Sequence, residues 1–108
     1  MRNYILSSIF LCALLIASCA TTRVVLPIPT QTDGERAAEK FPGTTLADLQ
    51  QGKIEYEEHC QGCHSLEAPQ SESEAEWRKI VPPMARKAKI SAEEENLILR
   101  YVVTMSAH

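Results

Sequence analysis

The part of the sequence with a regular hydrophobic pattern is short, running from Thr44 to Met105 in a chain of 108 residues. A folded segment of about 60 residues buries only about 60% of the surface that its unfolded form exposes. The pattern supplies aliphatic helix faces and a single tryptophan for a core. Such a domain usually needs a disulfide, a metal ion or a cofactor as well. The length leaves room for one domain and excludes a multidomain enzyme.

Capping signals mark the starts of the expected helices. Each signal is a Ser or Thr followed three positions later by an acidic residue, and the pairs are Thr45 with Asp48, Ser73 with Glu76, and Ser91 with Glu94. The expected helices cover residues 44–59, 73–81 and 92–104. Pro82 and Pro83 are expected to end the second helix, because proline lacks the N–H that continues it. No segment shows the alternation of apolar and polar residues that is typical of a β-strand, so the sequence predicts an all-α domain of three to four helices.

The N-terminal segment is typical of an export signal. Arg2 precedes an apolar run over residues 4–17, which is shorter than the about 20 residues that a membrane span needs. Residues 16–19 (Ile-Ala-Ser-Cys) resemble the lipobox of bacterial lipoproteins, in which the cysteine receives a diacylglyceryl group and becomes the new N-terminus. The resemblance implies a signal peptide over 1–18 and lipidation of Cys19; an ordinary signal peptide is the alternative.

Residues 19–43 are expected to form a flexible membrane tether, followed by the domain over 44–108. The tether contains Pro27, Pro29, Gly34 and Pro42, and its hydrophobic residues show no regular spacing. About 20 residues of flexible coil span roughly 25 Å on average. We therefore expect the domain to stand off the bilayer and to reorient.

The segment Cys60-Gln61-Gly62-Cys63-His64 has the C-x-x-C-H spacing of c-type haem attachment. Two thiols three positions apart can form thioethers to the two vinyl groups, and the adjacent His64 then faces the iron. With Cys12 in the signal and Cys19 acylated, no thiol is left over. The alternatives are a Cys60–Cys63 disulfide, a thioredoxin-like redox pair and half of a zinc site. Zinc lacks a second Cys/His pair, and a redox pair would sit in a βαβ context that is absent.

Together with Gly52, Tyr56, Met84 and Tyr101, this motif makes residues 46–104 resemble a small class I monohaem cytochrome c. The resemblance implies a helical domain wrapped around one covalently attached haem. It also implies that the first and last helices cross closely, with Gly52 meeting the aromatic Tyr101. The alternative for Gly52 is a simple helix defect that costs about 1 kcal/mol.

The resemblance implies that His64 and Met84 ligate the iron. A Met thioether raises the potential by favouring ferrous iron, and Met84 is expected on a loop after the proline pair. The other candidates for the second ligand are Met105, His59, His108 and an open site. Trp77 is expected either against a haem propionate, through its indole N–H, or simply in the core.

The charges are unevenly distributed. Seven glutamates lie within residues 55–76, whereas basic residues surround Met84, namely Arg78, Lys79, Arg86, Lys87 and Lys89. Such a cluster favours encounter with an acidic partner surface; ordinary solvated faces are the alternative. The net charge of −3 and the export signal argue against nucleic acid as a partner.

These features predict an extracytoplasmic, membrane-anchored cytochrome that passes single electrons between redox proteins and transforms no substrate itself. By resemblance to lipoproteins with a non-acidic residue after the acylated cysteine, Ala20 favours the outer over the inner membrane if the cell has both, with the domain facing the periplasm or the exterior. The alternatives are an electron-entry subunit of a larger oxidoreductase, and a haem-based gas sensor or peroxidase if Met84 is labile.

Overall fold

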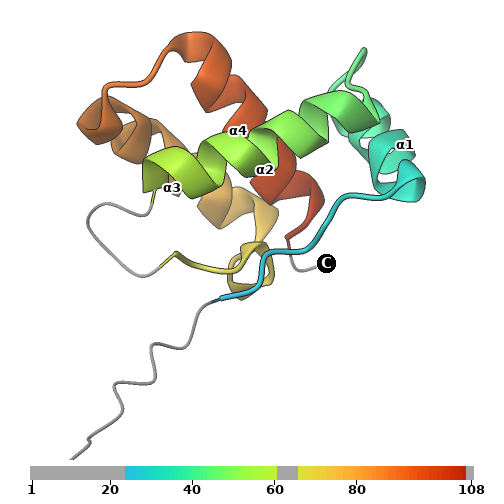
Figure 1. The fold of residues 1–108 in the computed structure, drawn as a ribbon, viewed down its shortest axis with the longest axis horizontal. Helices are drawn as coiled ribbons and strands as arrows, with labels where there is room; N and C mark the ends of the chain where they lie inside the picture. Colours follow the sequence, from blue (N-terminus) through green and yellow to red (C-terminus); the bar gives the residue numbers. More distant parts are fainter. Residues whose placement is uncertain (1–23, 61–65, 107–108) are drawn as a thin grey trace, which may run out of the picture.

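The computed structural model describes residues 24–60 and 66–106. This part of the chain is helical and contains no β-strand (Figure 1). Its elements are α1 (Gln31–Lys40), α2 (Leu46–Cys60), the short 3-10 helix η1 (Pro69–Ser71), α3 (Glu74–Ala88) and α4 (Ala92–Thr104). The all-α prediction is thereby confirmed for the described residues. None of their helices is long and apolar enough to cross a bilayer.

The capping pairs expected from the sequence are present at α2, α3 and α4. At α2 the N–H of Asp48 donates to Thr45 Oγ1 at 3.2 Å, and the N–H of Thr45 donates back to Asp48 Oδ2 at 2.9 Å. The hydroxyls of Ser73 and Ser91 accept from the third residue of α3 and α4, at 3.2 Å and 3.1 Å. Each bond satisfies a backbone donor that the helix itself leaves free, which explains why helices begin at these positions.

Helix α1 corrects the expectation of a flexible tether over 19–43. It begins with a further capping box, in which the N–H of Thr30 donates to Asp33 Oδ2 at 2.8 Å and the N–H of Asp33 donates to Thr30 Oγ1 at 3.4 Å. The helix is polar and buries only Gly34 and Ala37, so it shows no hydrophobic period in the sequence. The described part of the expected tether is therefore not free coil. The expected signal peptide over 1–18 and Cys19 lie outside the described residues.

The cap of α1 also sets the ionisation of Asp33. Partial burial raises the pKa of this carboxyl, but hydrogen bonds from Arg36 and from the N–H and hydroxyl of Thr30 outweigh burial and hold the pKa below its ordinary value. Asp33 is therefore ionised at neutral pH and lies at the positive end of the α1 dipole.

Helix α3 corrects the expectation that Pro82 and Pro83 end the second helix. It continues through both prolines to Ala88 and ends at Lys89, whose backbone is left-handed (φ 56°). The buried side chains of α3 lie on one stripe at four-residue spacing, Trp77, Val81 and Ala85. A break at the prolines would expose the end of this stripe, so its burial offsets the backbone hydrogen bonds that the prolines cannot donate.

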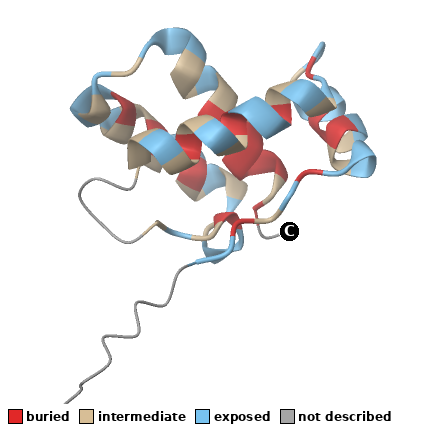
Figure 2. Ribbon diagram, in the orientation of Figure 1, coloured by how far each residue is buried: buried red, intermediate tan, exposed pale blue. Residues whose placement is uncertain are grey.

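The core lies where α2 and α4 cross (Figures 1 and 2). A Cβ atom at Gly52 would lie 2.2 Å from the carbonyl oxygen of Leu97 and 3.0 Å from Tyr101 Cβ. Only glycine allows this approach of the two helices, so the expected close contact between Gly52 and Tyr101 is confirmed. Tyr56 packs beside the crossing, with its ring centroid 6.2 Å from that of Tyr101 and 6.0 Å from that of Trp77.

The segment before α1 is packed onto the domain. Leu26 and Pro29 are buried, and the hydroxyl of Tyr101 donates to the carbonyl of Pro27 at 2.8 Å. This hydrogen bond joins positions 74 residues apart. We call residues 24–29 the strap.

Candidate functional site

An apolar hollow lies between the C-terminal end of α2, the second half of α3 and α4. It is lined by Tyr56, Cys60, Val81, Met84, Ala85, Ala88, Ile90 and Ile98. It therefore brings together Cys60, the first thiol of the C-x-x-C-H motif, and Met84, which lies 24 positions later. The hollow is narrow: its free space of about 10 Å³ admits about one water molecule.

Cys60 is the last residue of α2 and is half-buried, with its thiol free. Burial raises the pKa of this thiol, so the neutral form predominates at neutral pH. The remaining motif residues, including Cys63 and His64, lie outside the described residues. Where the described chain resumes, the hydroxyl of Tyr56 donates to the carbonyl of Glu67 at 2.6 Å. Both flanks of the motif are thus attached to α2.

Met84 lies within α3 and not on a loop, because the helix continues past the prolines. It is partly buried, and the turn of helix that carries it places it on the hollow. Met105 caps the C-terminal end of α4 and does not line the hollow. Of the two methionines in the described part of the chain, only Met84 lines the same hollow as Cys60. His108 lies outside the described residues.

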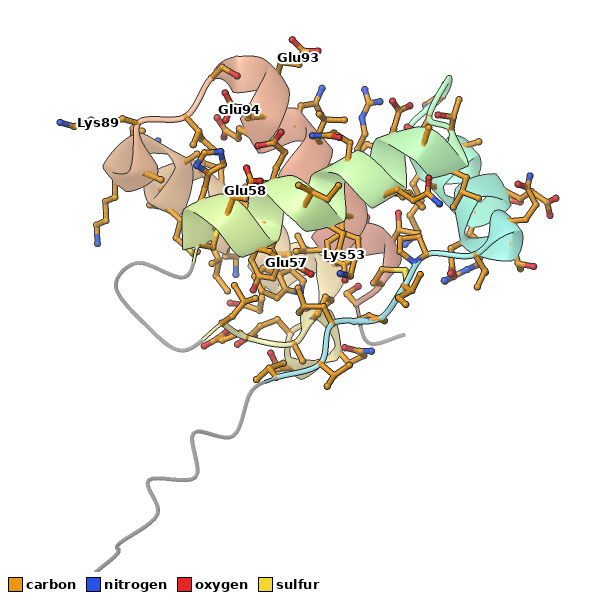
Figure 3. All side chains as sticks on the ribbon, in the orientation of Figure 1. Lys53, Glu57, Glu58, Lys89, Glu93 and Glu94 are labelled. Atoms are coloured by element: carbon orange, nitrogen blue, oxygen red, sulfur yellow. The ribbon has the colours of Figure 1, made fainter. Side chains whose placement is uncertain are left out.

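His59 is held between α2 and α4, with its Nε2 atom 3.0 Å from Glu55 Oε2 and 2.9 Å from Glu94 Oε2. In Figure 3, Glu94 lies over α2, whereas Glu93 points outward. Gln51 and Ser91 hydrogen-bond the second oxygens of the two carboxylates at 2.8 Å and 3.0 Å. Each carboxylate oxygen of Glu55 and Glu94 therefore has a partner within the domain. The three side chains of this group are also of types that bind metal ions. The four-residue spacing of Glu55 and His59 was visible in the sequence; the approach of Glu94 was not.

Trp77 is buried in the core and does not line the hollow. Its indole N–H donates to the carbonyl of Pro69 at 2.8 Å, and its ring packs edge-on against Tyr56. Because the indole N–H is its only donor, no group is left to bind a propionate. In the structure Trp77 is a core residue, and its one donor is already bound within the domain.

The basic residues divide into paired and unpaired groups. Six of those described form ion pairs with carboxylates: Arg36, Lys40, Lys53, Arg78, Lys79 and Arg100. Arg78 and Lys79, which the sequence grouped around Met84, are therefore neutralised by Glu74 and Glu76.

Three basic residues have no carboxylate partner among the described residues, namely Arg86, Lys87 and Lys89, and all three are exposed. They alternate along the chain with Ala85, Ala88 and Ile90 of the hollow. Figure 3 shows Lys89 at the end of α3, pointing away from the domain. Positive charge thus borders the hollow at the end of α3. We call these three residues the basic rim.

Comparisons of the chain with models of known protein families, with curated proteins and with solved structures give no match.

Proposed function

We propose that this protein is a membrane-anchored monohaem cytochrome c that transfers single electrons between redox proteins outside the cytoplasm. The observation that carries the proposal is the hollow, which is lined by both Cys60 of the C-x-x-C-H motif and Met84, together with apolar side chains. In this proposal Cys19 is lipidated and the protein resides in the cell envelope, with the outer membrane favoured.

The chemical character of the hollow fits a haem. Its lining is aliphatic and aromatic apart from the sulfur atoms of Cys60 and Met84 and the phenol of Tyr56. Cys60 and Cys63 would hold the macrocycle through thioethers, and His64 and Met84 would ligate the iron. Haem so bound supplies a reversible one-electron couple.

The free space does not yet fit a haem, because room for about one water molecule is far below an ordinary cofactor pocket of about 300–1,000 Å³. Room for the macrocycle would require the end of α3 to move away from α2. The helix around Met84 is suited to such a movement, since Pro82 and Pro83 leave two carbonyls of the preceding turn without backbone donors.

The chain's own residues then have distinct roles. Val81 and Ile98 exclude water from the hollow, and Tyr56 fixes the segment that resumes after the motif through its bond to Glu67. The basic rim, which has no internal partners among the described residues, would meet an acidic surface on the electron donor or acceptor.

The experiment is an optical spectrum of the full chain, produced with a periplasmic haem-attachment system, in ferric, ferrous and ferrous-plus-CO states. We expect covalently bound haem, no CO binding, and a sulfur-to-iron charge-transfer band that Met84→Ala abolishes. Met105→Ala is the matched control and retains the band.

Other results would redirect the proposal. Ready CO binding by the parent chain would remove Met84 as a firm ligand and favour gas sensing or peroxide chemistry. Absence of haem would return Cys60 and Cys63 to a disulfide or a zinc site. Co-purification with an oxidoreductase from solubilised membranes would identify an electron-entry subunit in place of a free carrier.

A further inference from the structure

We propose that the strap holds the domain against the lipid surface, with the side chains of Val25 and Ile28 in contact with the membrane. This inference rests on the lipidation of Cys19 that forms part of the proposed function. It does not depend on haem.

The strap is fixed to the body of the domain at several points. Leu26 is only 6% exposed and belongs to the main hydrophobic core. Pro29 is buried, and the hydroxyl of Tyr101, a residue at the helix crossing, binds the carbonyl of Pro27. The capping box of α1 begins directly afterwards at Thr30. The strap therefore moves with the domain.

This attachment shortens the link to the membrane. Between Cys19 and Leu26 there are seven residue steps, which span at most about 25 Å even when fully extended. A tether reaching to residue 43 would span up to about 80 Å by the same measure. Because a diacylglyceryl group holds its residue at the bilayer surface, Leu26 stays within about 25 Å of that surface.

The exposed apolar side chains lie where this short link meets the domain. Val25 is 89% exposed and Ile28 is 75% exposed, and Val24 is also exposed; the only other large apolar side chain in this class among the described residues is Ile54. Scattered exposed apolar side chains are ordinary, but these three lie within five consecutive positions at the anchored end. A lipid surface, which the anchor already brings close, is the partner that suits them.

The same geometry orients the site. In Figure 1 the chain enters the domain beside η1, whereas the connection between α3 and α4 lies on the opposite side of the view. Lys89 of the basic rim projects from that far side in Figure 3. With the strap on the membrane, the basic rim is directed toward soluble or protruding partners and away from the bilayer.

The test measures how fast a water-soluble maleimide alkylates single cysteines introduced at Val25→Cys, Ile28→Cys and Glu93→Cys. Glu93 is exposed at the start of α4 and serves as the control. The lipidated chain on phosphatidylethanolamine–phosphatidylglycerol vesicles is compared, with the same vesicles present, with an unlipidated Cys19→Ser chain that lacks residues 1–18, and mass spectrometry assigns each modified position. We expect alkylation at 25 and 28 to slow at least fivefold on vesicles, and at 93 to change less than twofold.

Equal rates at 25 and 28 in lipidated and unlipidated protein would overturn the inference. Protection of the unlipidated chain that grows with protein concentration would also overturn it, by showing that a second copy covers the strap. The mass spectra also show whether Cys19 carries the diacylglyceryl group. Absence of this group would refute the membrane anchor itself. A flexible insert of about 15 residues between Arg23 and Val24 should restore alkylation, and protection that survives the insert would refute the role of the short link.

Discussion

Replacement of Gly52 by alanine tests the helix crossing on which the domain is built. The new Cβ atom would lie 2.2 Å from the carbonyl oxygen of Leu97 and 2.9 Å from its carbonyl carbon. An ordinary carbon–oxygen contact is about 3.3 Å or more, so α2 and α4 must separate by about 1 Å. The obstructing atoms belong to the backbone of α4 and cannot move aside by rotating.

Two opposing effects set the size of the change. Alanine is favoured over glycine within a helix by about 1 kcal/mol. Overpacking a core costs about 1–3 kcal/mol, and a rigid backbone obstruction that loosens the buried Leu49, Ile98 and Tyr101 belongs at the upper end. We therefore expect Gly52→Ala to lower the free energy of unfolding by about 2 kcal/mol. For a domain of this size that corresponds to a fall in Tm of roughly 8–16 °C.

The measurement is urea unfolding of the parent and variants, followed by the helical circular dichroism signal. Gln50→Ala is the matched control because Gln50 is exposed on the same helix, and it should stay within about 0.5 kcal/mol of the parent. A Gly52→Ala variant as stable as the parent would show that α2 and α4 do not approach as closely as described, and would refute the reasoning.

Three further predictions concern stability. Pro83→Ala should raise the free energy of unfolding by about 1–3 kcal/mol, because it restores an N–H within α3; no change in the urea midpoint would indicate that the helix stops at the prolines. Trp77→Phe removes the indole N–H that donates to the carbonyl of Pro69, which keeps only its longer bond from the N–H of Glu72. The lost hydrogen bond should cost about 0.5–1.5 kcal/mol, while the visible spectrum of the haem-loaded protein stays as in the parent; a shifted spectrum would contradict the core role. Asp33→Asn should lower the urea midpoint at pH 7. Because the folded-state pKa of Asp33 lies below its ordinary 3.8, the contribution of its charge is present above that pH and is lost as the pH falls below it. The difference in urea midpoint between parent and variant should therefore shrink as the pH is lowered below 3.8. A difference that does not shrink there would exclude the charge as its source.

The sequence predicted which residues belong to the candidate site but not how the fold brings them together. The C-x-x-C-H spacing and the position of Met84 are properties of the sequence. Cys60 and Met84 line one hollow because α3 continues past Pro82 and Pro83. From the sequence alone, the two prolines predict that the helix ends before Met84.

The pairing of charges was local in part and non-local in part. The sequence places five basic residues around Met84, yet only three lack a carboxylate partner among the described residues. Arg78 is bound by Glu74 four positions earlier, and Lys79 by Glu76 three positions earlier. Glu74 also binds Lys40, across 34 residues of sequence. Helix spacing accounts for the first two pairs, whereas the third depends on the fold, which brings Lys40 at the end of α1 to Glu74 at the start of α3.

The sequence alone determined where α2, α3 and α4 begin, because a capping bond joins residues three positions apart and needs no other part of the fold. It also determined that Gly52 is the one place where α2 admits a close neighbour, since only glycine lacks a Cβ atom. The tertiary structure decided what depends on burial: α3 runs through its prolines to keep Trp77, Val81 and Ala85 covered, and the strap becomes part of the domain through Leu26. Burial is shared among residues far apart in the chain, so its outcome appears only when the helices are packed together.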